Sequence, residues 1–221
     1  MTFQLTEPIL LIGLGGVGAS LAEKAKKSLN SDCLLISHDQ KDLTAENSIK
    51  ISTKSVVNPS THLIRGSTLE TSDEIKKNIA NYSTVILMSN LAGKAGVGIG
   101  PIVSRICKQE QKNLLSFAIM PFKFEKERIF QSGIALKRIR QDSQCTIVVD
   151  NDALLDSNPD LTQKQCYDIS NKAIEGMMHS LKSSEISEDT NILSTGKATD
   201  DIEASLKDSL RMLYEDAPPN S

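Results

Sequence analysis

Two glycine-rich segments have the composition of loops that bind phosphate. Residues 13–18 read Gly-Leu-Gly-Gly-Val-Gly and lie between an apolar run and a stretch rich in helix-forming residues. Glycines at a strand-to-helix turn let the backbone approach a ligand closely, and a helix N-terminus offers unpaired N–H groups to an anion. A second glycine cluster, residues 92–101, follows another apolar run and precedes a helical stretch, Ile102 to Gln109. Two such loops at two strand ends predict a site that surrounds one polyphosphate.

The first loop alone leaves the nucleotide open. Asp39 follows the second apolar run, where the acidic residue of a dinucleotide-binding unit bonds the ribose. Residues 12–20 with Asp39 and Asn47 are similar to the opening of ATP-dependent adenylating enzymes of the ThiF type, and the loop with Asp39 alone would suit an NAD-dependent oxidoreductase. The adenylating enzyme would need an arginine soon after Asn47, which is absent, and the second glycine loop has no place in it. The oxidoreductase would need an acid–base residue, a role that fits none of the three histidines.

Short apolar runs alternate with helical stretches along the chain. Continuous apolar runs of this length are typical of strands covered on both faces, and their alternation with helices predicts a Rossmann-like α/β fold with a buried parallel sheet. The predicted strands are Pro8–Ile12, Cys33–Ile36, Val85–Met88, Leu114–Ile119 and Thr146–Val149.

The composition is that of one globular domain with no strong charge. The 221 residues are 39% hydrophobic, which allows one sizeable core. The 25 basic and 28 acidic residues give a formal charge of -3, too weak a field to concentrate nucleic acid or anionic lipid. No basic leader precedes the first strand, and no run approaches the ~20 apolar residues that span a bilayer, so a soluble cytoplasmic protein without membrane insertion is expected. Reduced core cysteines are expected at all four positions, Cys33, Cys107, Cys145 and Cys166, which lack paired metal-site spacing.

The C-terminal part of the chain differs in composition from the rest. A helical pattern runs from Thr162 to about Leu181 and is followed by an acidic, Ser- and Thr-rich stretch, residues 182–197. A last amphipathic helix is predicted from the spacing of Ile202, Leu206, Leu210 and Leu213. We therefore expect a nucleotide-binding domain over residues 1–181 and an acidic linker with a C-terminal helix over residues 182–221.

Further motifs carry a family resemblance. Residues 89–103 resemble the G-G-G-T-G-T-G-x-x-P signature of the FtsZ/tubulin superfamily, with Gly93, Gly96, Gly98 and Pro101 in register. The other matches are residues 13–18 to I-G-x-G-G-x-G, 37–43 to N-T-D-x-x-x-L, 121–125 to P-F-x-F-E with Arg128 near the following arginine, and 151–155 to N-D-x-L-L. The chain thus resembles a divergent, shortened FtsZ-like protein that has the N-terminal GTP-binding domain and lacks the C-terminal subdomain.

The resemblance implies a set of nucleotide-binding residues and a guanine nucleotide, GTP or GDP, as the ligand. Mg²⁺ is a candidate ion that would bind together with the nucleotide. A bulky residue at Gly96 would then abolish binding and leave the fold intact. Glu125 and Arg128 would serve the ribose and phosphate, Asn151 would close over the nucleotide, and Tyr167 or Asp168 would face the base. The residues implied at the phosphates and beside them are Gly15, Gly16, Gly18, Ala19, Ser20, Asp39, Gly93, Lys94, Ala95, Gly96, Val97 and Gly98.

Several departures from the family pattern bear on activity. Ala95 and Val97 replace two threonines of the signature, and Lys94 replaces a glycine and is expected to pair with a phosphate. The downstream N-x-D-x-x-D loop, whose acids act in FtsZ on the nucleotide of the next subunit, has no recognisable counterpart. The resemblance therefore implies a cell-division or cytoskeletal protein with weak or no GTP hydrolysis by itself. Its partners would be a second copy of the chain or another FtsZ-like or cell-division protein.

Overall fold

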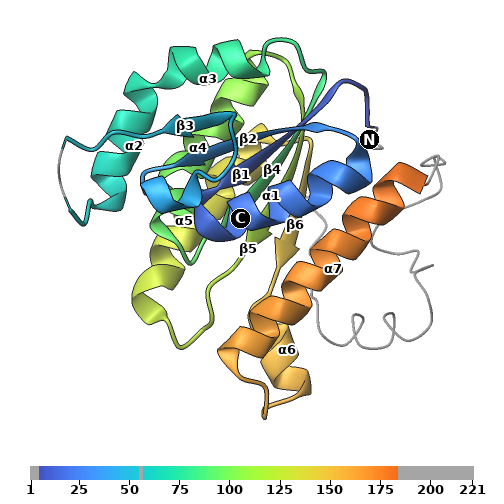
Figure 1. The fold of residues 1–221 in the computed structure, drawn as a ribbon. Coiled ribbons are helices and arrows are strands. Elements are labelled where there is room, and N and C mark those ends of the chain that lie inside the picture. The colour runs from blue at the N-terminus through green and yellow to red at the C-terminus, as the bar shows by residue number, and fades with distance from the viewer. Residues whose placement is uncertain (1–4, 55–56, 184–221) are drawn as a thin grey trace, which may run out of the picture.

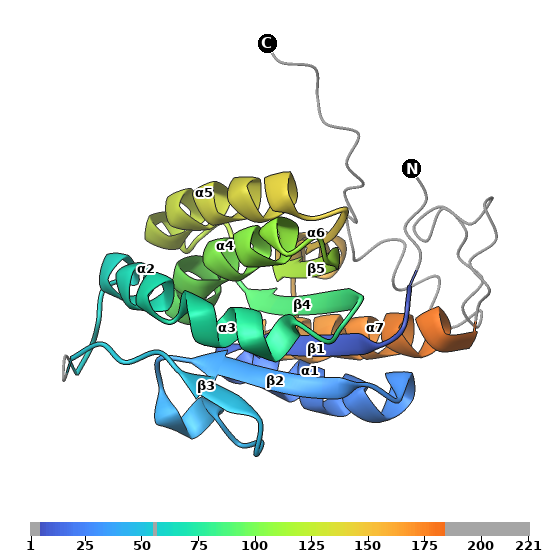
Figure 2. The same cartoon turned by 90° about the horizontal axis from the view of Figure 1, so that it is seen from above.

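The computed structural model describes residues 5–54 and 57–183, which form a central parallel sheet between two layers of helices (Figures 1 and 2). The sheet has six strands in the order β3-β2-β1-β4-β5-β6, and every neighbouring pair is parallel. This arrangement confirms the predicted α/β fold class. The strands are β1 (Ile9–Leu14), β2 (Asp32–Ser37), β3 (Ser48–Lys50), β4 (Thr84–Asn90), β5 (Asn113–Ile119) and β6 (Cys145–Val149).

The helices divide between the two faces of the sheet. On one face, α1 (Gly15–Leu29) and α7 (Gln163–Ser183) lie side by side, and the opposite face carries α2, α3, α4 and α5 (Figure 2). Alternate residues of each strand pack into two cores: Leu11 and Phe117 face α1 and α7, whereas Leu10 and Leu87 face α3 and α4. The remaining bounds are α2 (Thr61–Glu70), α3 (Ser72–Ile79), α4 (Lys94–Gln109), α5 (Lys126–Asp142), α6 (Asn151–Ser157) and the short 3₁₀ helix η1 (Gln40–Asp42).

The second glycine cluster is helical, which corrects the expectation of a loop before a helix at Ile102. Helix α4 begins at Lys94, so Gly96, Gly98 and Gly100 lie within it. A methyl group at Gly96 would lie 2.2 Å from the Asn90 carbonyl oxygen, and one at Gly98 would lie 2.8 Å from the Ile64 side chain. Glycine has low intrinsic helix propensity, but the close packing of this helix against its neighbours outweighs that preference.

Helix α4 also contains a proline whose missing hydrogen bond is replaced from outside. Pro101 has no N–H, so it cannot donate to the carbonyl of Val97, four residues earlier. The Arg65 guanidinium of α2 donates to that carbonyl at 3.5 Å. Residues 64–68 therefore belong to a helix that supports α4.

The acidic linker and the helix built on Ile202, Leu206, Leu210 and Leu213 lie outside the described residues, and the boundary at residue 181 stays a prediction. None of the helices within residues 5–54 and 57–183 is long and apolar enough to cross a bilayer. None of the four cysteines, all of which lie within the described residues, forms a disulfide; Cys145 is only half-buried, and burial raises the pKa of Cys107 to about 12.

Candidate nucleotide site

The site residues predicted from sequence converge at one edge of the sheet. Because all six strands are parallel, their carboxyl ends share this edge, and the loops that follow them meet there. From β1 the chain passes to β2 on one side, whereas from β4 it passes to β5 on the other. A reversal of this kind between adjacent strands is where ligands bind in open α/β sheets.

Two helices begin at this reversal point without side-chain caps. Neither Leu14, which precedes α1, nor Gly93, which precedes α4, makes a side-chain capping bond, and the first turns carry no acid. By contrast, the Ser60 hydroxyl accepts from the Leu63 N–H at the start of α2. A Cβ at Gly15 would lie 2.8 Å from that of Ala95, so the two helix starts are in contact. Their unpaired N–H groups and positive dipole ends suit an anion.

The glycines of the two segments serve different purposes. Gly15 has a positive φ of 64°, a left-handed conformation that favours glycine. Gly16 is exposed, whereas a methyl at Gly18 would lie 2.4 Å from the Met88 carbonyl oxygen of β4. Gly18, like Gly96 and Gly98, therefore makes room for protein atoms, and direct contact of these three with phosphate stays a prediction.

The segment after β2 adds residues that the sequence did not single out. The Asp42 carboxylate lies over the start of α1, with Oδ1 2.9 Å from the position of a Cβ at Gly16, and the Ser37 hydroxyl donates to its Oδ2 at 2.7 Å. His38 interacts electrostatically with Asp42. Burial lowers the pKa of the His38 imidazole, and its Nδ1 has no hydrogen-bond partner among the described residues. Asp39, which was singled out, pairs with Lys41 at 3.0 Å on the surface. An aspartate among polar neighbours does not stand out in the sequence. The position of Asp42 beside the start of α1 is therefore seen only in the folded structure.

Lys94, expected to pair with a phosphate, is held elsewhere. Its Nζ donates to the Asn58 Oδ1 at 2.6 Å and to the Pro59 carbonyl at 2.9 Å. These bonds tie the start of α4 to the segment that leads into α2. A contact between Lys94 and phosphate would need this ammonium to rotate away from both oxygens.

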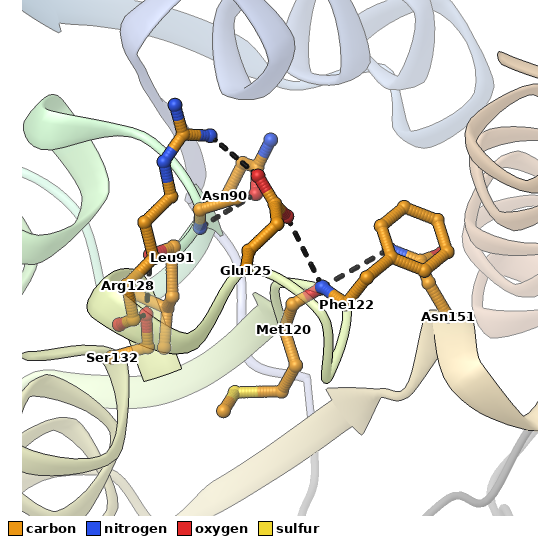
Figure 3. A network of polar contacts seen from close by, with 9 residues as sticks. Asn90, Leu91, Met120, Phe122, Glu125, Arg128, Ser132 and Asn151 are labelled. Carbon is orange, nitrogen blue, oxygen red and sulfur yellow. Dashed lines mark hydrogen bonds and ion pairs between the residues drawn. The ribbon is translucent and has the colours of Figure 1, made fainter. Parts of the chain in front are cut away.

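Glu125 and Arg128 lie at the start of α5 and pair with each other, and their contacts with ribose and phosphate stay a prediction (Figure 3). Arg128 Nη1 lies 2.7 Å from Glu125 Oε1, and the other carboxylate oxygen accepts from the Phe122 N–H at 3.2 Å. Asn90 lies at the end of β4, and its Oδ1 accepts from the Ala92 N–H. The Arg128 side chain is 59% exposed, so its remaining donors face solvent.

Asn151 makes hydrogen bonds within the protein, whereas it was expected to close over the nucleotide. Its side chain is fully buried at the start of α6, where Nδ2 donates to the Met120 carbonyl at 3.2 Å and Oδ1 accepts from the Ser170 hydroxyl at 2.6 Å. The amide thus joins β5 to α7, and both of its polar ends are engaged. The expectation that it closes over the nucleotide does not fit this geometry, because such a contact would require breaking these bonds.

The helix expected to face the base is α7. Tyr167 is half-buried and packs edge-on against Phe122 at 5.5 Å, and burial raises the pKa of its phenol, whereas Asp168 is exposed. An ion pair at 2.8 Å between Lys24 and Glu175 ties α1 to α7, which run in the same direction (Figure 1). Ser20 lies one turn before Lys24 in α1, and Asp168 lies two turns before Glu175 in α7. Which of Tyr167 and Asp168 meets a base stays a prediction.

Comparison with known proteins gives the family. The family model for the Tubulin/FtsZ family, GTPase domain, matches residues 8–159. The chain is 25% identical to cell division protein FtsZ 2 of Halobacterium salinarum over 180 residues, covering 75% of this chain and 44% of that protein. It is 26% identical to FtsZ 1 of the same organism over 192 residues, covering 81% and 47%.

Solved structures agree with this fold. An FtsZ dimer from M. jannaschii superimposes with a TM-score of 0.72 at 21% identity, covering 81% of this chain and 57% of that chain. TubZ of Clostridium botulinum phage c-st superimposes with a TM-score of 0.66 at 16% identity, covering 96% and 77%.

The parallel sheet with glycine-lined helix starts at its reversal point defines an α/β domain of Rossmann-like architecture. The family match extends across both glycine segments and residues 121–155, and it covers most of the described chain. The chain therefore belongs to the Tubulin/FtsZ family. It spans less than half the length of the two Halobacterium salinarum relatives, 44% and 47%. The comparisons give no support to the adenylating alternative, which has no place for the second glycine segment.

Proposed function

We propose that the chain binds a guanine nucleotide, GTP or GDP, at the carboxyl edge of the sheet and acts in cell division or the cytoskeleton by association. The observation that supports this most directly is the contact between the uncapped starts of α1 and α4 at the reversal point of the sheet. Two helix dipoles and their free N–H groups favour a polyphosphate there. Arg128, although paired with Glu125, keeps an exposed guanidinium, and family membership supports guanine as the base.

Guanine nucleotides should raise the melting temperature of the nucleotide-free protein more than ATP or NAD does. A ligand that binds only the native state, at about 100 times its Kd, stabilises it by about 2.7 kcal/mol. For a domain of this size we expect a rise of ~5–10 °C. Differential scanning fluorimetry measures this, and mass spectrometry of nucleotide retained after purification gives an independent check. Stabilisation by ATP alone would overturn the guanine assignment and restore the adenylating alternative.

Hydrolysis by the chain alone is proposed to be weak or absent. The family's water-positioning acids have no recognisable counterpart among these 221 residues, and Glu185, Glu188 and Asp189 lie outside the described residues. Such acids act on the nucleotide of a neighbouring subunit, so a partner that carries them would supply catalysis. The chain is accordingly proposed as a binding module in an assembly.

The surface that we assign to association with a second copy is the outer face of α5. Phe130 is 74% exposed and Ile134 is 38% exposed one turn further, with Lys126 and Lys137 on the same face. Neighbouring exposed apolar side chains on a soluble domain often mark a contact surface.

Replacing Phe130 with serine should shift the protein toward monomer in sedimentation velocity. The change removes the largest exposed apolar side chain of α5 and leaves the core untouched. Leu69→Ser is the matched control, because Leu69 is 53% exposed on α2 and is expected to leave association unchanged. Equal distributions for wild type and both variants at micromolar concentration would remove α5 from the association surface.

A further inference from the structure

The Asp42 carboxylate lies beside the first two residues of α1. Its Oδ1 is 2.9 Å, and its carboxyl carbon 3.6 Å, from the position of a Cβ at Gly16, and Oδ2 is 3.9 Å from that at Gly15. These two glycines open the first turn of α1, which has no acid and no side-chain cap of its own. The Ser37 hydroxyl holds Oδ2 at 2.7 Å. The carboxylate is thus positioned by the end of β2 over an uncapped helix N-terminus.

No cation neutralises this carboxylate by direct contact among the described residues. Lys41, its neighbour in the chain, pairs with Asp39 at 3.0 Å, and the Lys94 ammonium is bound to Asn58 and Pro59. Nothing described donates a hydrogen bond to Oδ1. The charge of Asp42 therefore lies without a direct ion pair beside the N-terminal dipole of α1, the same feature that would attract a phosphate.

We infer that Asp42 mimics a phosphate in the nucleotide-free chain and competes with the nucleotide for the start of α1. This inference rests on the proposed function, because it concerns the same site. A phosphate that enters must displace the carboxylate or share the space with it, and two anions at such separation repel. A divalent cation relieves the repulsion, since the free Oδ1 and the phosphate oxygens are the hard ligands that Mg²⁺ prefers. Asp42 thus makes nucleotide affinity depend on divalent cation.

The test is the affinity of the nucleotide-free full chain for fluorescent GDP, with EDTA and with Mg²⁺. Asp42→Asn keeps the size of the side chain and removes its charge. In EDTA we expect it to bind at least tenfold more tightly than wild type, and in Mg²⁺ we expect the two to agree within threefold. Ser37→Ala should change affinity in the same direction by less, because it frees the carboxylate without discharging it. Glu46→Gln is the matched control, since Glu46 is an exposed acid in the following segment, and it should bind like wild type.

Each of the following outcomes supports or overturns the inference. Equal affinity of wild type and Asp42→Asn in EDTA, with wild-type melting temperature in both, overturns the competition and leaves the proposed function in place. Weaker binding by Asp42→Asn overturns it too, and makes Asp42 a group that holds the nucleotide. If Asp42→Asn binds GDP in EDTA and wild type does not, the inference stands. If none of the four proteins binds GDP or GTP under either condition, the proposed function fails and the inference fails with it.

Discussion

Gly96→Ala is expected to destabilise the fold by roughly 3 kcal/mol, the cost of forcing an atom into a closely packed interior. A Cβ at this position would lie 2.2 Å from the Asn90 carbonyl oxygen and 2.7 Å from its carbonyl carbon. Both atoms belong to the backbone at the end of β4, so no side chain can rotate aside. The start of α4 would have to move away from the sheet. For a domain of this size the melting temperature should fall by ~6–12 °C, measured by thermal unfolding without nucleotide.

Gly133→Ala supplies the matched control. Gly133 lies in α5 with nothing within 4 Å of its Cβ position, so alanine should stabilise the protein by ~0.5–1 kcal/mol through higher helix propensity. The same substitution thus has opposite signs at two helical glycines. The sequence alone attributes Gly96 to the approach of a phosphate, which predicts that a larger residue spares the fold. A Gly96→Ala protein that melts like wild type and has lost GDP binding would restore that interpretation.

The second large effect is expected at Asn151. Alanine at this fully buried position would leave the Met120 carbonyl and the Ser170 hydroxyl without their partner. An unsatisfied buried polar group costs ~1–3 kcal/mol, so we expect a loss of about 3 kcal/mol in urea unfolding. The link between β5 and α7 would be weakened, and the start of α6 with it.

A double-mutant cycle separates this role from a nucleotide contact. Asn151→Ala and Ser170→Ala should be coupled by about 1 kcal/mol or more, because each removes the partner of the other. Asn158→Ala, an exposed asparagine just beyond α6, should change stability by less than ~0.5 kcal/mol. If Asn151→Ala weakened GDP binding while unfolding like wild type without nucleotide, its assignment as a nucleotide contact would be correct and the structural one wrong.

The strands could be predicted from sequence because burial on both faces leaves a continuous apolar run. The runs 33–36 and 85–88 fall inside β2 and β4, which are almost fully buried. The edge strand β3, Ser48–Lys50, has no such run, because its residues alternate in burial and it is only three residues long. Local sequence shows a strand only where both layers of helices cover it.

The candidate site was accessible from sequence only in part. The order of the motifs predicted the segments that meet at the carboxyl edge of the sheet. These segments include Glu125 and Arg128, which form an ion pair. The order of the motifs could not give the start of α4, because glycine propensity argues against a helix there and the packing that favours it is tertiary. It could not give Asp42 either, since an aspartate's position over Gly16 depends on how η1 folds back against α1.

Helix α7 has a consequence for what counts as one unit of this protein. The family match stops at residue 159, yet Ala173, Ile174, Met178 and Leu181 of α7 share a core with Leu11 and Phe117 of the sheet. A fragment that ended with the match would lose these side chains and would expose to water the sheet surface that they cover. The described part of α7 therefore belongs to the same hydrophobic core as the matched residues, although it lies beyond the inherited signature.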